Sequence, residues 1–191
     1  MIKRRKTRKV KIGNVEIGGN APISIQSMTK TDTKDVAATL TEISRLKKAG
    51  CEIVRIAIKD KNCVEPLKKI VEKAKIPIEA DIHFMPQLAL DAIGAGVDAI
   101  RLNPGNIKKE EDIRLIIKSA KAAKIPIRIG VNSGSVGTKV RSMADAMVKS
   151  ALSYVKIFEK ARFHDIIISL KSSGVSETIE AYGKMAALCD Y

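Results

Sequence analysis

Two kinds of hydrophobic pattern take turns along the chain. Short runs of consecutive apolar residues alternate with longer segments in which apolar residues return every three or four positions. The first pattern is typical of a strand that is buried on both faces, and the second of a helix with one buried face. Because this pairing occurs six times, we expect parallel strands that are connected by helices.

The boundaries of these elements follow from the turn residues between them. Asp32 or Thr33 is expected to cap the first helix, and Gly50 to close it. A β-hairpin around Gly13-Asn14 is expected to precede all six units, in the segment KVKIGNVEI. The expected strands are 23–28, 52–58, 76–83, 98–103, 125–132 and 164–171, and the later helices lie near 62–75, 86–95, 108–123, 143–162 and 175–189.

Two architectures fit this alternation, an open doubly wound sheet and a (β/α)8 barrel. No glycine-rich dinucleotide loop follows the first strand, which counts against the open sheet. The predicted fold class is therefore α/β, an incomplete (β/α)8 TIM barrel with about six βα units and an amino-terminal hairpin. Residues 1–191 are expected to form a single, truncated barrel domain, since the chain ends at its sixth predicted helix and a complete barrel has eight βα units.

Charged residues interrupt the apolar strands at matching positions. Side chains two residues apart on a strand share a face, so aligning the apolar runs places these charges on the inner face at nearly equivalent depth. The residues at that depth are Arg55, Glu79, Arg101 and Arg128. Further along the same face come Asp81, His83, Asn103, Asn132, Ser169 and Lys171. All of them gather at the carboxyl ends of the strands, where barrels carry their active sites.

The cations on this face outnumber the carboxylates. A buried surplus of positive charge is tolerable only if an anion or water completes it, and guanidinium groups match phosphate oxygens in geometry. We therefore expect a phosphate or diphosphate ligand; the alternative is an internal layer of salt bridges around Glu79 that carries out no chemistry. The segments NPGN and NSGSVG could add backbone N–H groups or be plain turns, and His83 beside Asp81 could move a proton or stay neutral.

Composition adds few constraints. The formal net charge is +14, and the basic segment KRRKTRK is expected to be a solvated arm or to contact nucleic acid or phosphate. No apolar run is long enough to span a membrane, and Met1 is followed by charged residues, so a cytoplasmic location is expected. Cys51, Cys63 and Cys189 match no metal or redox spacing and are expected to be buried thiols.

Several strings together resemble one enzyme family. RRKTRKVKIGNVEIGGNAPISIQSMTKTDT, EADIHF, IRLNPGNI, IRIGVNSGS and FHDIIISLKSS are similar, in order and spacing, to the amino-terminal barrel of the 4-hydroxy-3-methylbut-2-enyl diphosphate synthases of non-mevalonate isoprenoid biosynthesis. The resemblance implies reductive ring opening of 2-C-methyl-D-erythritol 2,4-cyclodiphosphate at a 4Fe-4S cluster fed by ferredoxin or flavodoxin, in a head-to-tail homodimer. It places the diphosphate on Arg55, Arg101, Asn103, Arg128, Asn132 and Lys171, with Asp81 and His83 as catalytic candidates.

The chain also departs from that family. The resemblance implies a carboxyl-terminal domain that holds the cluster with three Cys and one Glu, and this domain is absent from the 191 residues, so no metal site is expected here. The loop from Ser133 to Met143 looks short, and SSGV follows Lys171 where an acidic residue is often expected. This chain alone is expected to be inactive. Two alternatives stay open: a phosphate or pterin barrel enzyme similar to dihydropteroate synthase, and a basic nucleic-acid-binding module.

Overall fold

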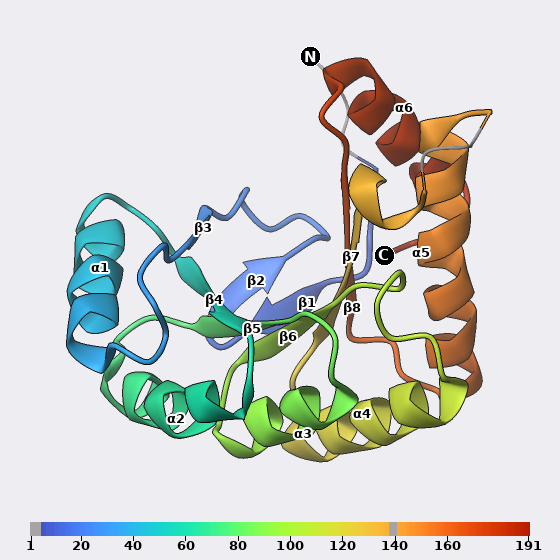
Figure 1. Cartoon of the computed structure of the whole chain (residues 1–191). Helices are drawn as coiled ribbons and strands as arrows, with labels where there is room; N and C mark the ends of the chain where they lie inside the picture. Colours follow the sequence, from blue (N-terminus) through green and yellow to red (C-terminus); the bar gives the residue numbers. More distant parts are fainter. Residues whose placement is uncertain (1–4, 138–140) are drawn as a thin grey trace.

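The fold is built around a parallel sheet that curls with its helices on the outside (Figure 1). The computed structural model describes residues 5–137 and 141–191. The sheet has six strands in the order β3-β4-β5-β6-β7-β8, and each pair of neighbours is parallel. The strands are β3 (Gln26–Met28), β4 (Ile53–Ile58), β5 (Ile78–Ile82), β6 (Ala99–Leu102), β7 (Ile127–Asn132) and β8 (Ile166–Lys171). This order, with every strand beside its predecessor in sequence, is that of a TIM barrel and confirms the predicted fold class.

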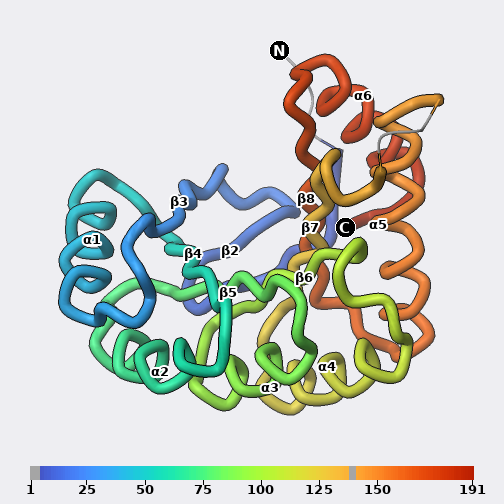
Figure 2. The backbone as a smooth tube through the Cα atoms, viewed as in Figure 1, coloured from blue at the N-terminus to red at the C-terminus, as the bar shows by residue number. Residues whose placement is uncertain are grey.

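The helices form an arc along the outer face of the sheet, as the chain trace in Figure 2 shows. They are α1 (Val36–Lys48), α2 (Val64–Lys73), α3 (Pro86–Gly94), α4 (Glu110–Ala123), α5 (Met143–Lys160) and α6 (Val175–Ala186), with short 3-10 turns at Lys61–Cys63 and Ser133–Ser135. The outward side chains of the strands are aliphatic: Val54, Ile56 and Ile58 on β4, for example, are fully buried against this layer. The opposite faces of the same strands point into the sheet's concave side, which leaves that side free for polar residues.

The predicted hairpin is present and covers the amino-terminal end of the sheet. β1 (Val10–Ile12) pairs antiparallel with β2 (Val15–Ile17), and Gly13 adopts a φ of 55°, which favours glycine in the turn. Val10 and Ile12 pack on Ile53, Ala99 and Ile167, the first inward residues of three strands. The hairpin thus closes the bottom of the sheet with an apolar cluster, so that the polar residues above it face the carboxyl ends.

Some predicted boundaries are wrong. Asp35, not Asp32 or Thr33, caps α1: its carboxylate accepts the Ala38 N–H at 2.9 Å. Thr33 instead donates its hydroxyl to the carbonyl of Ala57 at 2.8 Å, and Asp32 accepts the Lys34 N–H within the preceding turn. The side chains of a loop rich in Thr and Asp can bond to several backbone groups, and tertiary contacts choose among them.

Other elements are shorter than predicted. The expected strand 23–28 is reduced to β3, which has a single neighbour among the described residues, and Ile23 and Ile25 before it are exposed. The helix expected to reach 189 ends at Ala186. The helix expected near 62–75 begins only after a 3-10 turn, and α4 and α5 each differ from the prediction by two residues at one end. Such differences at helix ends do not alter the architecture.

The basic amino-terminal segment is partly docked. Arg5 donates hydrogen bonds of 2.6 to 2.9 Å to the carbonyls of Ala186, Cys189 and Tyr191, and the Arg8 guanidinium lies 5.7 Å from the centre of the Tyr191 ring. These two arginines therefore have a structural role that the sequence did not indicate. Residues 1–4, which include Lys3 and Arg4 of that segment, and residues 138–140 of the loop before Met143 lie outside the described residues.

Three further expectations concern membrane spans, the burial of the cysteines and metal sites. Among the described helices, none is both long and apolar enough to cross a membrane. Cys51 and Cys63 are buried as expected, whereas Cys189 is only half-buried. Nowhere in residues 5–137 and 141–191 do three or more His, Cys, Asp or Glu side chains gather closely enough to hold a metal ion.

Candidate functional site

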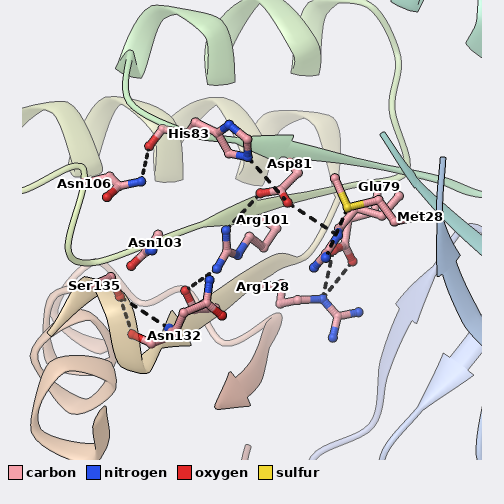
Figure 3. A network of polar contacts seen from close by, with 12 residues as sticks. Met28, Glu79, Asp81, His83, Arg101, Asn103, Asn106, Arg128, Asn132 and Ser135 are labelled. Atoms are coloured by element: carbon pink, nitrogen blue, oxygen red, sulfur yellow. Dashed lines mark hydrogen bonds and ion pairs between the residues drawn. The ribbon is translucent and has the colours of Figure 1, made fainter. Parts of the chain in front are cut away.

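The inward charged residues meet in one network on the concave side of the sheet (Figure 3). Arg55 of β4 stands beside Glu79 of β5, while Arg101 of β6 stands beside Asp81 of β5 and Arg128 of β7. The predicted face is therefore right, but the predicted level is not: Arg101 lies opposite Asp81, one inward position above Glu79. The stagger between parallel strands shifts the levels, and the apolar frame of each strand alone does not reveal it.

Glu79 and Arg128 form the deepest ion pair of the network. The Glu79 side chain is 0% exposed, and the Arg128 Nε donates to both of its oxygens, at 3.0 and 2.8 Å. The Arg128 side chain is 12% exposed and reaches across β6 to make this contact. Because both oxygens of a fully buried carboxylate are bonded to one guanidinium, this pair is part of the barrel's internal structure.

Asp81 is shared by three basic side chains. Its Oδ1 accepts the Arg101 Nη1 at 3.0 Å, and its Oδ2 lies 3.5 Å from the Arg55 Nε and 3.9 Å from the His83 Nε2. Asp81 and Arg101 are buried, while Arg55 and His83 are half-buried. One carboxylate therefore serves two guanidinium groups, so its negative charge offsets only one of them.

The contacts of Arg101 explain how a guanidinium is accommodated within the apolar run IRLNPGN. Its Nη1 binds Asp81 and its Nη2 donates to the carbonyl of Gly130 at 2.8 Å, so the side chain links β5 to β7. Its Nε is buried and has no hydrogen-bond partner in the described structure, and the same holds for the Arg55 Nε. A buried N–H without an acceptor is costly, so both atoms are donors for which a ligand or water would be favourable.

The salt-bridge layer that the sequence left as an alternative is thus present, but it is not balanced. At formal charges, Arg55, Arg101 and Arg128 contribute three positive charges, and Glu79 and Asp81 contribute two negative ones, so one positive charge remains. Lys171, at the end of β8, is exposed and forms no ion pair in the described part of the chain. The surplus therefore lies toward the carboxyl ends of the strands.

The segment NPGN at the end of β6 is fixed by its own side chains. Asn103 is buried and accepts the Gly105 N–H at 3.0 Å, while Asn106 donates to the His83 carbonyl at 2.6 Å. The next residue, Ile107, offers its carbonyl to a hydrogen bond from the buried Tyr154 hydroxyl on α5. The loop after β6 is thereby tied both to the end of β5 and to the helical layer.

Asn132 and Lys171 lie further out. They are aligned across β7 and β8, and both are exposed. The side chain of Asn132 belongs to a capping box with Ser135, whose hydroxyl donates to the Asn132 carbonyl at 2.7 Å. In the described part of the chain, no hydrogen bond or ion pair joins either residue to the arginine network, so the eight predicted residues form an inner group and an outer rim.

Several residues of the network were not found by sequence reasoning, among them Met28, whose Sδ accepts a hydrogen bond of 3.4 Å from the Arg55 Nη2 (Figure 3). Asn106 and Tyr154 act through backbone carbonyls, for which the sequence carries no signal beyond the polarity of the side chain. Gly130 is a further case: as an inward position without a side chain, between Arg128 and Asn132, it breaks the polar pattern of β7 and could have been noticed.

The sequence matches one protein family along nearly its whole length. A family model described as the GcpE TIM-barrel domain matches residues 7–191. A curated relative from Dehalococcoides mccartyi, named 4-hydroxy-3-methylbut-2-en-1-yl diphosphate synthase (flavodoxin), is 50% identical over 100% of this chain and 56% of its own length. A relative of the same name from Clostridium perfringens is 52% identical over 95% of this chain and 53% of its own length. The chain spans about half the length of the curated relatives it matches.

Solved structures support the fold. A dihydropteroate synthase from Xanthomonas albilineans superposes with a TM-score of 0.69 over 97% of this chain and 74% of its own, at 12% identity. A phospho-2-dehydro-3-deoxyheptonate aldolase from Thermotoga maritima gives 0.61 over 85% of this chain and 46% of its own, at 11% identity. At 11–12% identity these likenesses show the fold alone, whereas the family match rests on the sequence of residues 7–191. The chain therefore belongs to the GcpE TIM-barrel domain family.

Proposed function

We propose that this chain is the barrel part of a 4-hydroxy-3-methylbut-2-en-1-yl diphosphate synthase, which acts on 2-C-methyl-D-erythritol 2,4-cyclodiphosphate. Support comes from the names of relatives about half identical to it over nearly the whole chain. The likeness to dihydropteroate synthase, the rival enzyme class, is one of fold only. Docking of Arg5 and Arg8 on the carboxyl-terminal residues weakens the case for a free nucleic-acid-binding arm.

The diphosphate is proposed to bind at the carboxyl ends of the strands. The observation that carries this proposal is the unbalanced positive charge together with the buried Nε atoms of Arg55 and Arg101, neither of which has a hydrogen-bond partner in the described structure. An anion supplies acceptors for such donors and neutralises the surplus, which water does only in part. Lys171 would meet the outer oxygens, because it is exposed and has no carboxylate partner in the described structure.

The other proposed residues have supporting roles. Asn103 and Asn132 lie at the ends of β6 and β7 and would orient the ligand beside the arginines. His83, 3.9 Å from Asp81, would hold or move a proton at its Nε2. Arg128 would act mainly through Glu79, and its Nη atoms, which have no hydrogen-bond partner among the described residues, would be available to the ligand.

The residues of this chain do not fit a 4Fe-4S cluster. Two of its three cysteines are buried in the helical layer, and the described residues contain no group of three possible ligands. We therefore assign no step of the reduction to this chain. The cluster, its supply of electrons from flavodoxin or ferredoxin, and a homodimer that brings cluster and barrel together remain parts of the proposal that concern the whole enzyme; flavodoxin is the donor in the names of the relatives.

Calorimetric titration of the 191-residue chain with the cyclodiphosphate tests the binding proposal. Lys171→Met removes a cation without stranding a buried partner, so it should weaken binding by about tenfold or more, the range for a hydrogen bond to a charged group, at unchanged stability. Lys118→Met on α4 is the matched control, since Lys118 is also exposed but lies on the outer layer. A chain that does not bind the ligand, or equal affinities of both variants, would refute the site.

The catalytic assignment is tested in the setting of a full-length relative, because this chain spans about half the length of the relatives it matches. Residues 7–191 can replace the matched segment in the Clostridium perfringens relative, and reduced flavodoxin can then be supplied without oxygen. Formation of the diphosphate product by this chimera is expected. A chimera that folds and carries its cluster but gives no product would contradict the assigned activity.

A further inference from the structure

The guanidinium of Arg101 is held in a position that its own strand does not dictate. It stretches from the Asp81 carboxylate to the carbonyl of Gly130, with only 6% of the residue exposed. We infer that Gly130 and Pro104 are positioning residues, which together fix the Arg101 guanidinium across the mouth of the barrel. This inference rests on the proposed role of Arg101 in diphosphate binding.

Gly130 provides the room. A Cβ atom on Gly130 would lie 2.2 Å from the Arg101 Nε and 3.0 Å from its Cζ and Nη2. Real Cβ atoms essentially never come closer than 3.0 Å, so any side chain here would displace the guanidinium. The backbone of Gly130 does not adopt a positive φ, so the requirement for glycine comes from the neighbouring arginine and not from backbone conformation.

Pro104 bears on the acceptor, which is the Gly130 carbonyl. Along the β6–β7 ladder the N–H of Ile100 donates to the carbonyl of Pro126, one residue before its aligned partner Ile127. The paired residues of this ladder end at Leu102 and Ile129, and Pro104 lies in the turn that follows. Parallel ladders repeat every two residues, so a ladder continued in the same register would pair the nitrogen of residue 104 with the carbonyl of Gly130. Proline has no N–H, so residue 104 cannot extend the ladder to that carbonyl. The Arg101 Nη2 donates to the Gly130 carbonyl instead, at 2.8 Å.

The consequence is a guanidinium with fixed direction. Arg101 and Arg128 are aligned on neighbouring strands, and two cations in such a pair repel each other. Arg128 reaches down to Glu79, while Arg101 is held at both ends at the level of Asp81. Nη1 and Nη2 each donate one hydrogen bond within the protein, whereas Nε is the guanidinium nitrogen without a hydrogen-bond partner in the described structure, so a ligand or water that accepts from it would be favourable.

A double-mutant cycle tests whether Gly130 acts through Arg101. Gly130→Ala, Arg101→Met and the double variant are compared for cyclodiphosphate affinity and for resistance to urea. We expect each single variant to bind about tenfold more weakly or worse, as when a charged hydrogen-bond donor is lost, and Gly130→Ala to cost almost nothing further in the Arg101→Met background. Gly94→Ala on α3 is the control, since nothing lies within 4 Å of its added Cβ. Additive losses would overturn the inference.

Nuclear magnetic resonance supplies a readout that does not depend on the ligand. The buried Arg101 Nε–H should give a distinct signal that exchanges slowly with water, assigned by its loss in Arg101→Met. Gly130→Ala should move this signal and speed its exchange, while Gly94→Ala leaves it unchanged. Pro104→Ala, which offers the Gly130 carbonyl a competing N–H, should speed exchange as well. An Arg101 signal that neither Gly130→Ala nor Pro104→Ala changes would refute the positioning role.

The two readouts separate the inference from the proposed function. If the chain does not bind cyclodiphosphate but the signal and the urea cycle change as expected, the proposed function fails and the positioning of Arg101 stands. If the ligand binds and Lys171→Met weakens it, but Gly130→Ala binds as tightly as the unmodified chain, the proposed function stands and the inference fails.

Discussion

Replacing Arg128 with methionine isolates the deepest ion pair of the barrel. The Glu79 side chain is fully buried, and in the described structure the Arg128 Nε is the sole hydrogen-bond donor to its two oxygens. Arg128→Met therefore leaves a buried carboxylate without its ion-pair partner and without a hydrogen-bond donor in the described structure. Removing one partner of a buried pair costs about 3–5 kcal/mol, whereas the pair as a whole can be nearly neutral relative to apolar residues.

That loss is large compared with the stability of a domain. A typical free energy of unfolding is about 5–15 kcal/mol, so Arg128→Met should lower the urea midpoint strongly, with an unchanged slope if unfolding stays two-state. Arg114→Met is the matched control. Arg114 pairs with Glu110 one turn away on α4 at 2.7 Å, but both side chains are about half exposed, so its loss should cost about 0–1 kcal/mol.

The double variant Glu79→Gln/Arg128→Met decides whether the buried charge is the cause. Glutamine keeps the shape of the side chain but carries no charge, so the double variant should regain a substantial part of the stability lost in Arg128→Met. The reasoning is refuted if Arg128→Met destabilises no more than Arg114→Met, or if the double variant is less stable than Arg128→Met alone.

Two further changes test contacts away from the ion pairs. Tyr154→Phe removes the hydroxyl that donates to the carbonyl of Ile107 and should cost about 1–3 kcal/mol in urea unfolding, since that buried carbonyl loses its partner. Although burial alone would raise it, the backbone N–H groups of Thr31 and Lys30 hold the pKa of Glu42 below its ordinary value of 4.5. A lowered pKa in the folded state stabilises the fold above pH 4.5, and this contribution is lost as the pH falls through the folded pKa. Glu42→Gln should therefore unfold with a weaker dependence on pH in that acid range, and an unchanged dependence would contradict the assignment.

The sequence predicted the sheet well because each strand was marked twice, by its own apolar run and by the helix that follows it. It also predicted the inner face correctly, since the alternation of side chains within one strand needs no knowledge of its neighbours. The sequence did not predict which inward residues lie at the same level on neighbouring strands. Arg101 lies opposite Asp81 and not opposite Glu79, because that relation depends on the stagger between strands.

The partners of the charged residues could not be predicted for a related reason. Glu79 and Arg128 are 49 residues apart in sequence and belong to strands that are not neighbours. Their contact depends on how far the sheet curls, which no local pattern encodes. The capping residue of α1 was predicted wrongly although it depends on residues close together in sequence. Several Asp and Thr side chains within six residues can bond to the backbone there. Thr33 donates to a carbonyl of β4, and Asp35 caps the helix.

The salt-bridge layer and the ligand site are better viewed as two depths of one arrangement than as rivals. At the bottom, Glu79 uses both oxygens on a single arginine; one level higher, Asp81 is divided between two arginines; at the rim, Lys171 has no carboxylate in the described structure. Positive charge is thus progressively less compensated toward the carboxyl ends of the strands. It follows that substitutions should change from chiefly lowering stability at Arg128 to chiefly lowering affinity at Lys171, and that Arg101, between them, should lower both.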